Sequence, residues 1–183
     1  KCLDLIRRLG VRGVRVRCVL TAGGAQFVTP LSLAALSEDT VYSDLFSLTD
    51  ESQMGHIQLS RDADLLVVTP ASADILARMA AGIADDLATT VLLATDKPVL
   101  VAPAMNVRMW SHKATQENIL KLKSFGYEFI GPDAGDMACG EYGEGKMSEP
   151  ETIKNYLNNF LSKKKIKHIK SVKSNRDCWT YKR

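Results

Sequence analysis

The chain has 183 residues, of which 45% are hydrophobic, and a formal net charge of +3. That length suits one domain with a substantial core plus a tail. The charge is uneven, because residues 163–183 hold nine Lys or Arg and one acidic residue, which leaves 15 basic and 20 acidic residues and a net charge of −5 for residues 1–162. This balance excludes a basic nucleic-acid-binding face across the folded part.

The cysteines and the hydropathy bear on metal binding, membrane association and the cellular compartment. Four widely separated cysteines without metal-ligand spacing predict neither a disulfide framework nor a metal site. No apolar run reaches membrane-spanning length, so we expect no membrane association, and a reducing cytoplasm is the default location.

The first third of the chain predicts a helix, a strand and a second helix. Residues 2–9 place apolar side chains on one face of a helix that Gly10 ends, and residues 14–20 alternate apolar and basic side chains, as a strand does. Residues 21–25 then turn the chain, and residues 30–36 read as a short helix.

The middle of the chain predicts buried parallel strands alternating with helices. Residues 64–70 form a continuous apolar run, which is typical of a strand covered on both faces. Helices are expected over 73–84 and 86–94, with another strand over 99–102. Strands and helices that alternate with short connections indicate a three-layer α/β fold.

The last third predicts a helix over 115–125, a strand over 127–130 and a helix over 150–161. Together the elements predict a Rossmann-like α/β domain with a mainly parallel sheet over residues 1–161. Because the chain begins inside a helix, we infer that a first strand and its loop are missing before Lys1. Residues 162–183 show no periodicity and are expected to form a basic tail or linker.

Two segments stand out from this framework. Residues 103–110 follow a buried strand with the sequence Pro-Ala-Met-Asn-Val-Arg-Met-Trp, at a position where open α/β sheets bind ligands. Residues 136–147 place one cysteine in a glycine-rich, loop-like setting. An amide, two thioethers, an indole and a thiol in such positions suggest an enzyme built around a cofactor.

Six ordered motifs show that the chain resembles a known family. They are Phe27 to Leu31, Gly55-His56-Ile57, Pro70 to Ala73, Gly82 to Leu87, Pro103 to Trp110 and Ala138-Cys139-Gly140. Over residues 1 to about 151 the chain is similar to the flavin-containing cysteine decarboxylases. Within that family it most resembles the phosphopantothenoylcysteine decarboxylase domains of bacterial bifunctional coenzyme A biosynthesis proteins.

The resemblance implies an FMN-dependent decarboxylation of 4′-phosphopantothenoylcysteine to 4′-phosphopantetheine. Cysteine has no carbonyl group that could accept electrons as its carboxylate leaves, so a flavin must first oxidise the sulfur-bearing carbon and later return the hydride. The resemblance also implies a homotrimer, or trimers assembled into a dodecamer, with the flavin near the subunit boundary. The second, CTP-dependent synthetase domain of the bifunctional proteins has no counterpart in residues 162–183, so we expect no synthetase activity.

The resemblance implies two catalytic residues. His56 matches the histidine that assists the oxidative half-reaction, although a lone histidine is commonly a helix-end or surface residue. Cys139 matches the proton donor of the reductive half-reaction, although a lone loop cysteine is ordinarily unremarkable. Its flanks match a flexible flap that closes over the substrate.

Substrate contacts are implied for five further residues: Asn106, Met109, Ala138, Gly140 and Arg61. Asn106 matches an amide that holds the substrate carboxylate without the full positive charge that would oppose loss of carbon dioxide. An asparagine in a loop otherwise makes a turn, and a methionine otherwise fills a core. Arg61 matches an arginine that supports the active site or a subunit contact. The alternative is an ordinary arginine that lies in solvent.

Cofactor contacts are implied for six residues: Thr21, Phe27, Ser72, Ala73, Asp74 and Ala104. Ser72 can both cap a helix and lie near the FMN phosphate, because a helix N-terminus attracts anions. Asp74 stands where the family usually has Asn, and an unneutralised carboxylate there would repel the phosphate or the reduced flavin.

Two alternatives remain open at this point. The first is a related oxidative decarboxylase that acts on the terminal cysteine of a peptide. The second is an inactive flavin-fold remnant or regulatory subunit that binds partners without turnover.

Overall fold

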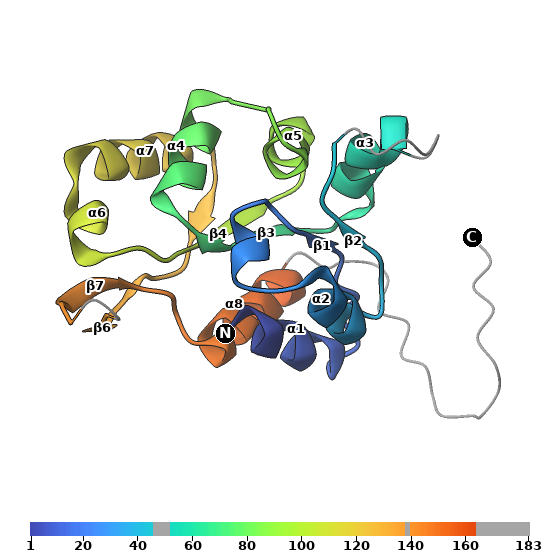
Figure 1. The fold of residues 1–183 in the computed structure, drawn as a ribbon, viewed down its shortest axis with the longest axis horizontal. Coiled ribbons are helices and arrows are strands. Elements are labelled where there is room, and N and C mark those ends of the chain that lie inside the picture. The colour runs from blue at the N-terminus through green and yellow to red at the C-terminus, as the bar shows by residue number, and fades with distance from the viewer. Residues whose placement is uncertain (46–51, 138–139, 164–183) are drawn as a thin grey trace.

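A computed structural model describes residues 1–45, 52–137 and 140–163 of the chain (Figure 1). The helices are α1 (Cys2–Gly10), η1 (Gly24–Gln26), α2 (Pro30–Ser37), α3 (Ser52–Asp62), α4 (Ala73–Ala81), α5 (Leu87–Ala94), α6 (Val107–Ser111), α7 (Lys113–Ser124) and α8 (Pro150–Lys163). The strands are β1 (Cys18–Val19), β2 (Val41–Tyr42), β3 (Leu66–Ala71), β4 (Val99–Pro103), β5 (Glu128–Phe129), β6 (Asp133–Asp136) and β7 (Tyr142–Lys146).

Parallel strands form the centre of the fold, as predicted. Strand β4 lies between β3 and β5 and pairs in parallel with both, and β1 pairs in parallel with β2. The pairing of β3 with β4 runs from Leu66 opposite Val99 to Ala71 opposite Pro103. Every residue of β4 is buried, which explains its continuous apolar sequence.

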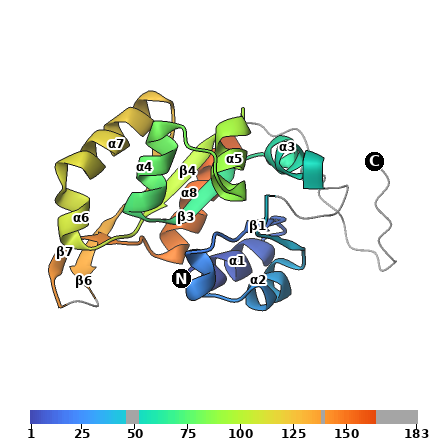
Figure 2. The ribbon, with the colours of Figure 1, turned by 45° about the horizontal axis from the view of Figure 1, so that its top comes forward.

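Helices cover both faces of this sheet and make the expected three layers (Figures 1 and 2). Val99 and Val101 of β4 point into a core shared with α4 and α7, whereas Leu100 and Ala102 point into a second core shared with α1 and α8. The alternation follows from the period of two residues along a strand. The predicted α/β fold with a mainly parallel sheet is therefore confirmed.

Local capping signals set the helix boundaries. Ser72 caps α4, and the helix ends at Ala81 because Gly82 adopts a left-handed conformation with φ of 69°. The helix predicted over 73–84 is therefore three residues too long. Asp86 forms a capping box with Thr89, so α5 begins at Leu87 rather than at Asp86.

Several elements differ from the sequence-based expectations. The strand expected over 14–20 is reduced to Cys18–Val19, and β2 and α6 were not predicted. The segment 136–147, expected to be loop-like, contributes to an antiparallel hairpin of β6 and β7. Glycine-rich sequences have low strand propensity, so only tertiary contacts could reveal this hairpin.

Candidate functional site

The carboxyl ends of β3 and β4 bring two of the predicted cofactor segments side by side. Ala71 at the end of β3 pairs with Pro103 at the end of β4, and the Ala104 amide donates to the Ala71 carbonyl over 2.9 Å. Ser72 and Ala104 therefore follow the two strands at the same edge of the sheet. In a parallel sheet this edge is where ligands bind.

Ser72 and Ala73 form the entrance to α4 at this edge. The exposed Ser72 places its Oγ 3.3 Å from the Ile75 amide, from which it accepts a hydrogen bond. The first amides of a helix point outward and favour anions. The capping and the ligand-binding interpretations of Ser72 are thus geometrically compatible.

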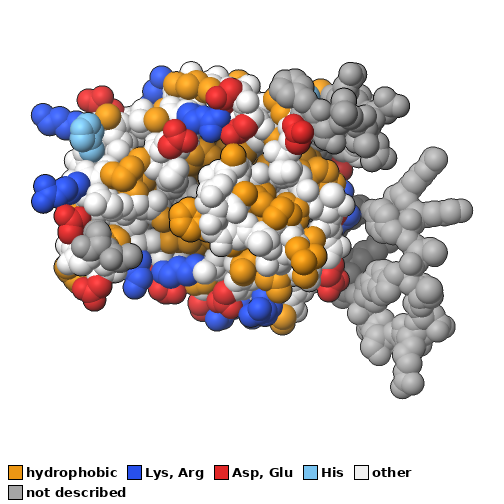
Figure 3. All heavy atoms as spheres, in the orientation of Figure 1, with side chains coloured by type: hydrophobic (Ala, Val, Ile, Leu, Met, Phe, Trp, Pro, Cys, Tyr) orange, Lys and Arg blue, Asp and Glu red, His pale blue; other side chains and the backbone are white. Residues whose placement is uncertain are grey.

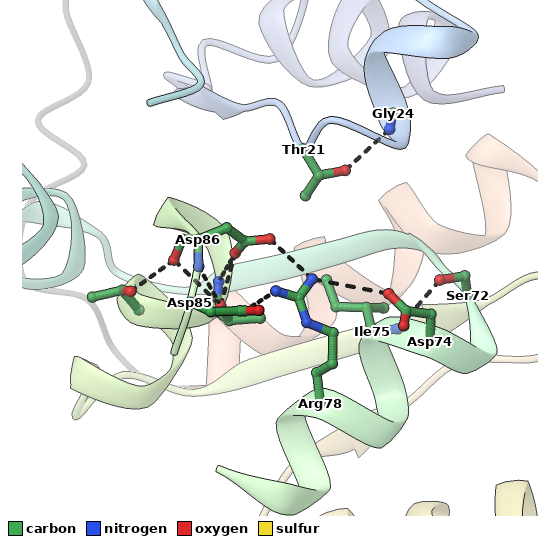
Figure 4. A network of polar contacts seen from close by, with 10 residues as sticks. Thr21, Gly24, Ser72, Asp74, Ile75, Arg78, Asp85 and Asp86 are labelled. Atoms are coloured by element: carbon green, nitrogen blue, oxygen red, sulfur yellow. Dashed lines mark hydrogen bonds and ion pairs between the residues drawn. The ribbon is translucent and has the colours of Figure 1, made fainter. Parts of the chain in front are cut away.

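Asp74 lies in the first turn of α4 and belongs to a charged cluster around Arg78 (Figure 4). The Arg78 guanidinium lies 3.9 Å from the Asp74 carboxylate, 3.0 Å from Asp86, and in contact with Asp85. The hydrogen bonds with Asp85, first of all, and with Asp86 raise the pKa of Arg78 above its ordinary value. One arginine and three aspartates leave a formal charge of −2, so Asp74, with its side chain 78% exposed, is only partly neutralised.

The loop after β1 carries Thr21 and Phe27. Thr21 Oγ1 accepts a hydrogen bond from the Gly24 amide over 3.1 Å, which closes a tight turn into the short helix η1 (Figure 4). Phe27 is not part of a core, because 90% of it is exposed. Leu31, in the first turn of α2, is 79% exposed. On the face drawn in Figure 3, hydrophobic side chains gather over the middle of the molecule and charged side chains lie mainly around the rim.

Asn106 follows β4 and caps α6. Its Oδ1 accepts from the Met109 amide over 2.9 Å, and its Nδ2 donates to Glu141 Oε2 over 3.2 Å. The cap fixes which end of the amide faces the helix, so that the NH₂ group points toward the hairpin. Met109 is 48% exposed and does not fill a core.

The hairpin of β6 and β7 packs closely on the segment that carries Asn106. The Met105 amide donates to the Gly145 carbonyl over 2.9 Å, and Trp110 Nε1 donates to Glu144 over 3.0 Å. A Cβ atom at Gly145 would lie 2.2 Å from the Met105 carbonyl oxygen, and one at Gly143 would lie 2.8 Å from Val107. These glycines are therefore required by the close approach of β7 to α6.

The predicted flap residues are only partly visible. Ala138 and Cys139 lie outside the described residues. Gly140 is exposed with φ of 81°, its amide donates to the Met137 carbonyl, and the Met137 amide donates to the Glu141 carbonyl. The roles expected for Ala138 and Cys139 stay predictions.

His56 and Arg61 lie on α3, far from the Asn106 region. His56 is half-buried and Arg61 is exposed. Helix α3 packs against α5, with Leu59, Leu87 and Val91 in a shared cluster. In both ribbon views α3 lies at the opposite end of the molecule from α6 and β7 (Figures 1 and 2). One copy of the chain therefore does not bring His56 to Asn106.

Three polar residues of this site were not predicted from the sequence. They are Arg78, which links α4 to the start of α5, and Arg108 and Glu141, which pair with each other over 3.1 Å. Glu141 lies inside the glycine-rich segment that the sequence singled out, but nothing in its spacing indicates a contact with Asn106, 35 positions earlier.

Among residues 1–45, 52–137 and 140–163, no group of three or more His, Cys, Asp or Glu side chains could hold a metal ion. Within these same ranges, no helix has the length and apolar character needed to cross a bilayer.

Comparison with known proteins places these features in context. The family named Flavoprotein matches residues 1–162. The chain is 47% identical over 166 residues to the bifunctional coenzyme A biosynthesis protein CoaBC of Vibrio vulnificus, covering 91% of this chain and 41% of the relative. It thus spans about two fifths of the length of that relative.

Two solved structures show the same fold. A Cys-to-Ser mutant of PPC decarboxylase complexed with pantothenoylaminoethenethiol is 36% identical, with a TM-score of 0.77 over 86% of this chain and 88% of that one. The FMN-binding protein AtHal3 is also 36% identical, with a TM-score of 0.75 over the same shares of the two chains.

Proposed function

The chain belongs to the Flavoprotein family, and on that premise we propose that it is an FMN-dependent decarboxylase acting on 4′-phosphopantothenoylcysteine in coenzyme A biosynthesis. The product is 4′-phosphopantetheine. The resemblance to CoaBC and to PPC decarboxylase supports this substrate over a cysteine-ended peptide.

A single observation carries the proposal: the Asn106 amide is held in place at the carboxyl end of β4, beneath a glycine-rich hairpin. The cap on α6 orients its NH₂ group, and that group donates to a carboxylate in this structure. An amide in this place can bind the substrate carboxylate without opposing its departure as a cationic side chain would.

The residues that would hold FMN lie in the loops that follow β1, β3 and β4. Ala73 and Ala104 have small side chains, which let a flat ring approach the backbone, and the start of α4 supplies amides for the phosphate. Thr21 and the exposed ring of Phe27 lie in the loop after β1. The partly neutralised Asp74 would weaken binding of the FMN phosphate there. Bound FMN would supply the hydride acceptor and donor that cysteine decarboxylation needs.

The residues of the chain supply orientation and protons. Asn106 orients the substrate carboxylate so that its C–C bond can break. His56 accepts a proton from the substrate during its oxidation. Loss of carbon dioxide converts the oxidised substrate into an enethiolate, and Cys139 would donate the proton needed for its reduction to the thiol product.

The separation of His56 from Asn106 supports an active site built between subunits. Since α3 and α6 lie at opposite ends of one copy, we expect a second copy to bring its α3 to the Asn106 of the first (Figure 1). A homotrimer, alone or assembled into a dodecamer, closes three such sites by symmetry. Phe27 and Leu31 have exposed apolar side chains, which favours a further contact between subunits at these residues.

The subunit arrangement can be tested by mixing two inactive variants. In a trimer reassembled from equal amounts of His56→Asn and Asn106→Asp chains, roughly a quarter of the shared sites hold both native residues. We therefore expect activity to return to about a quarter of the wild-type value in the mixture. If each site used one chain only, the mixture would stay inactive.

The reaction itself is tested with the purified wild-type chain. We expect a yellow protein with the two absorption bands of bound flavin, and release of carbon dioxide from 4′-phosphopantothenoylcysteine but not from a cysteine-ended peptide. A protein that is colourless with excess FMN would contradict the proposal, and activity on the peptide alone would transfer it to the peptide decarboxylases.

Two variants of Asn106 separate chemistry from folding. Asn106→Asp and Asn106→Ser both retain a good helix cap for α6. Only Asp places a negative charge against the substrate carboxylate, so we expect kcat/KM to fall by roughly 100-fold or more in Asn106→Asp and less in Asn106→Ser. Equal flavin content in all three proteins is the control for folding.

A further inference from the structure

The amide that we assign to the substrate carboxylate already binds a carboxylate of the chain itself. Asn106 Nδ2 donates to Glu141 Oε2 over 3.2 Å. Since Oδ1 of the same amide is used by the cap on α6, the NH₂ group is the part of Asn106 that faces a ligand. Glu141 therefore uses the same donor group that the substrate requires.

A second donor binds the other oxygen of the Glu141 carboxylate. Arg108 Nε donates to Glu141 Oε1 over 3.1 Å, so each oxygen of the carboxylate accepts a hydrogen bond from α6 or its cap. The Arg108 side chain is 85% exposed and the Glu141 side chain 35% exposed. Ion pairs that are this open to solvent contribute little, so the pair with Arg108 holds the Glu141 carboxylate only weakly.

The base of the hairpin is held independently of Glu141. The Met105 amide binds the Gly145 carbonyl, and Trp110 binds Glu144. The close approaches of Gly143 to Val107 and of Gly145 to Met105 lie on the same strand. Displacement of Glu141 from Asn106 therefore frees one side chain without detaching β7 from α6.

We propose that Glu141 is a built-in competitor of the substrate carboxylate, which occupies the Asn106 amide in the free enzyme and yields it to the substrate. This proposal rests on the proposed function, because it needs a substrate carboxylate at Asn106. Glu141 then lowers the affinity for carboxylate-bearing ligands and leaves ligands without that carboxylate unaffected. Arg108 serves as the holder of Glu141 and not as a substrate ligand.

The competition by Glu141 affects the affinity for the substrate but not the affinity for the decarboxylated product. The substrate must break the bond between Asn106 and Glu141, whereas the decarboxylated product, 4′-phosphopantetheine, lacks the group that competes for Asn106. Glu141 acts in this way as a positioning and specificity residue and takes no part in the bond changes. Its removal should tighten substrate binding selectively.

The experiment compares affinities in holoenzyme that cannot turn over. Four proteins, each carrying His56→Asn so that the ligand is not consumed, are titrated by calorimetry with 4′-phosphopantothenoylcysteine and with 4′-phosphopantetheine. They are the parent, Glu141→Gln, Arg108→Gln and, as the matched control from the same hairpin, Glu144→Gln. Flavin content is measured for each protein to verify folding. Glu144 binds Trp110 and not Asn106, so its loss should not affect the competition.

The expected result is a selective gain in affinity. A charge-assisted hydrogen bond is replaced by a weaker neutral one in Glu141→Gln, so Kd for 4′-phosphopantothenoylcysteine should fall about threefold to tenfold. Kd for 4′-phosphopantetheine should change by less than about twofold, and Glu144→Gln should match the parent with both ligands. Arg108→Gln should leave the substrate Kd equal or lower, because it releases Glu141.

Three outcomes would overturn the proposal: unchanged or weaker substrate binding in Glu141→Gln, an equal shift for both ligands, or weaker substrate binding in Arg108→Gln. Failure of the proposed function is recognised separately. A native His56 enzyme that binds the substrate yet releases no carbon dioxide refutes the function, while the affinity ratio still decides the role of Glu141. A holoenzyme that binds neither ligand overturns both.

Discussion

Replacing Gly145 by alanine tests whether β7 must lie directly against the segment that carries Asn106. The new Cβ would lie 2.2 Å from the Met105 carbonyl oxygen, at a backbone φ of 142° that other residues rarely adopt. The backbone of β7 would have to move away, because a carbonyl oxygen in the main chain cannot rotate aside as a side chain can. The 2.9 Å bond from the Met105 amide to the Gly145 carbonyl would then be lost.

The cost of this change can be worked out from the two effects. The lost hydrogen bond contributes about 1 kcal/mol, and the strained backbone about 1–3 kcal/mol. Local stability of the hairpin should therefore fall by roughly 2–4 kcal/mol, which accelerates exchange of the Met105 amide hydrogen by roughly 30-fold or more. We also expect kcat/KM to fall, because the position of Asn106 depends on this contact.

Hydrogen exchange measured by NMR or mass spectrometry on the holoenzyme provides the assay, and two glycines on the same hairpin provide the controls. A Cβ at Gly135 would meet only the flexible Lys146 side chain, at 3.1 Å, so Gly135→Ala should change exchange at Met105 very little. Gly143→Ala, which meets the Val107 side chain at 2.8 Å, should lie between the two. An unchanged Met105 amide in Gly145→Ala, or an equal effect of Gly135→Ala, would refute the reasoning.

Three further perturbations give distinct results. Asp74→Asn should tighten FMN binding about threefold to fivefold, because it removes an exposed unit charge near the anion site, and fluorescence titration of the apoprotein measures this; unchanged or weaker binding would show that Asp74 does not face the phosphate or the reduced ring. Burial alone would raise the pKa of Asp86, but the hydrogen bonds of Thr89 and Arg78 outweigh it and lower the pKa from its ordinary 3.8. This stabilisation is therefore present above pH 3.8 and lost as the pH falls through the folded value, so urea unfolding should show the stability gap between wild type and Asp86→Asn closing in acid, and a constant gap would speak against it. Cys139→Ser should retain FMN yet release an unsaturated, decarboxylated product that mass spectrometry identifies; full conversion to 4′-phosphopantetheine would remove Cys139 from the role of proton donor.

The tertiary structure showed the surroundings of residues whose contacts the sequence did not determine. The resemblance implies a cofactor contact for Phe27, and only the folded chain shows that its side chain is 90% exposed and fills no core. Asp74 was expected to need neutralisation, and only the folded chain shows that Arg78 divides its charge among three aspartates. Such pairings depend on contacts between elements, which local sequence patterns do not encode.

The sequence by itself determined the order of buried strands and covering helices, because hydrophobic periodicity and capping residues act within a few positions of the chain. The apolar run of β4 and the cap Ser72 were readable in this way, whereas Asp86 was expected inside the helix that it caps. Only the tertiary structure decided that a glycine-rich stretch forms the hairpin β6–β7, that Glu141 reaches Asn106, and that α3 carries His56 to the far end of the molecule. The physical reason is that these features arise from close packing between distant segments, where a missing side chain or one carboxylate matters more than any local preference.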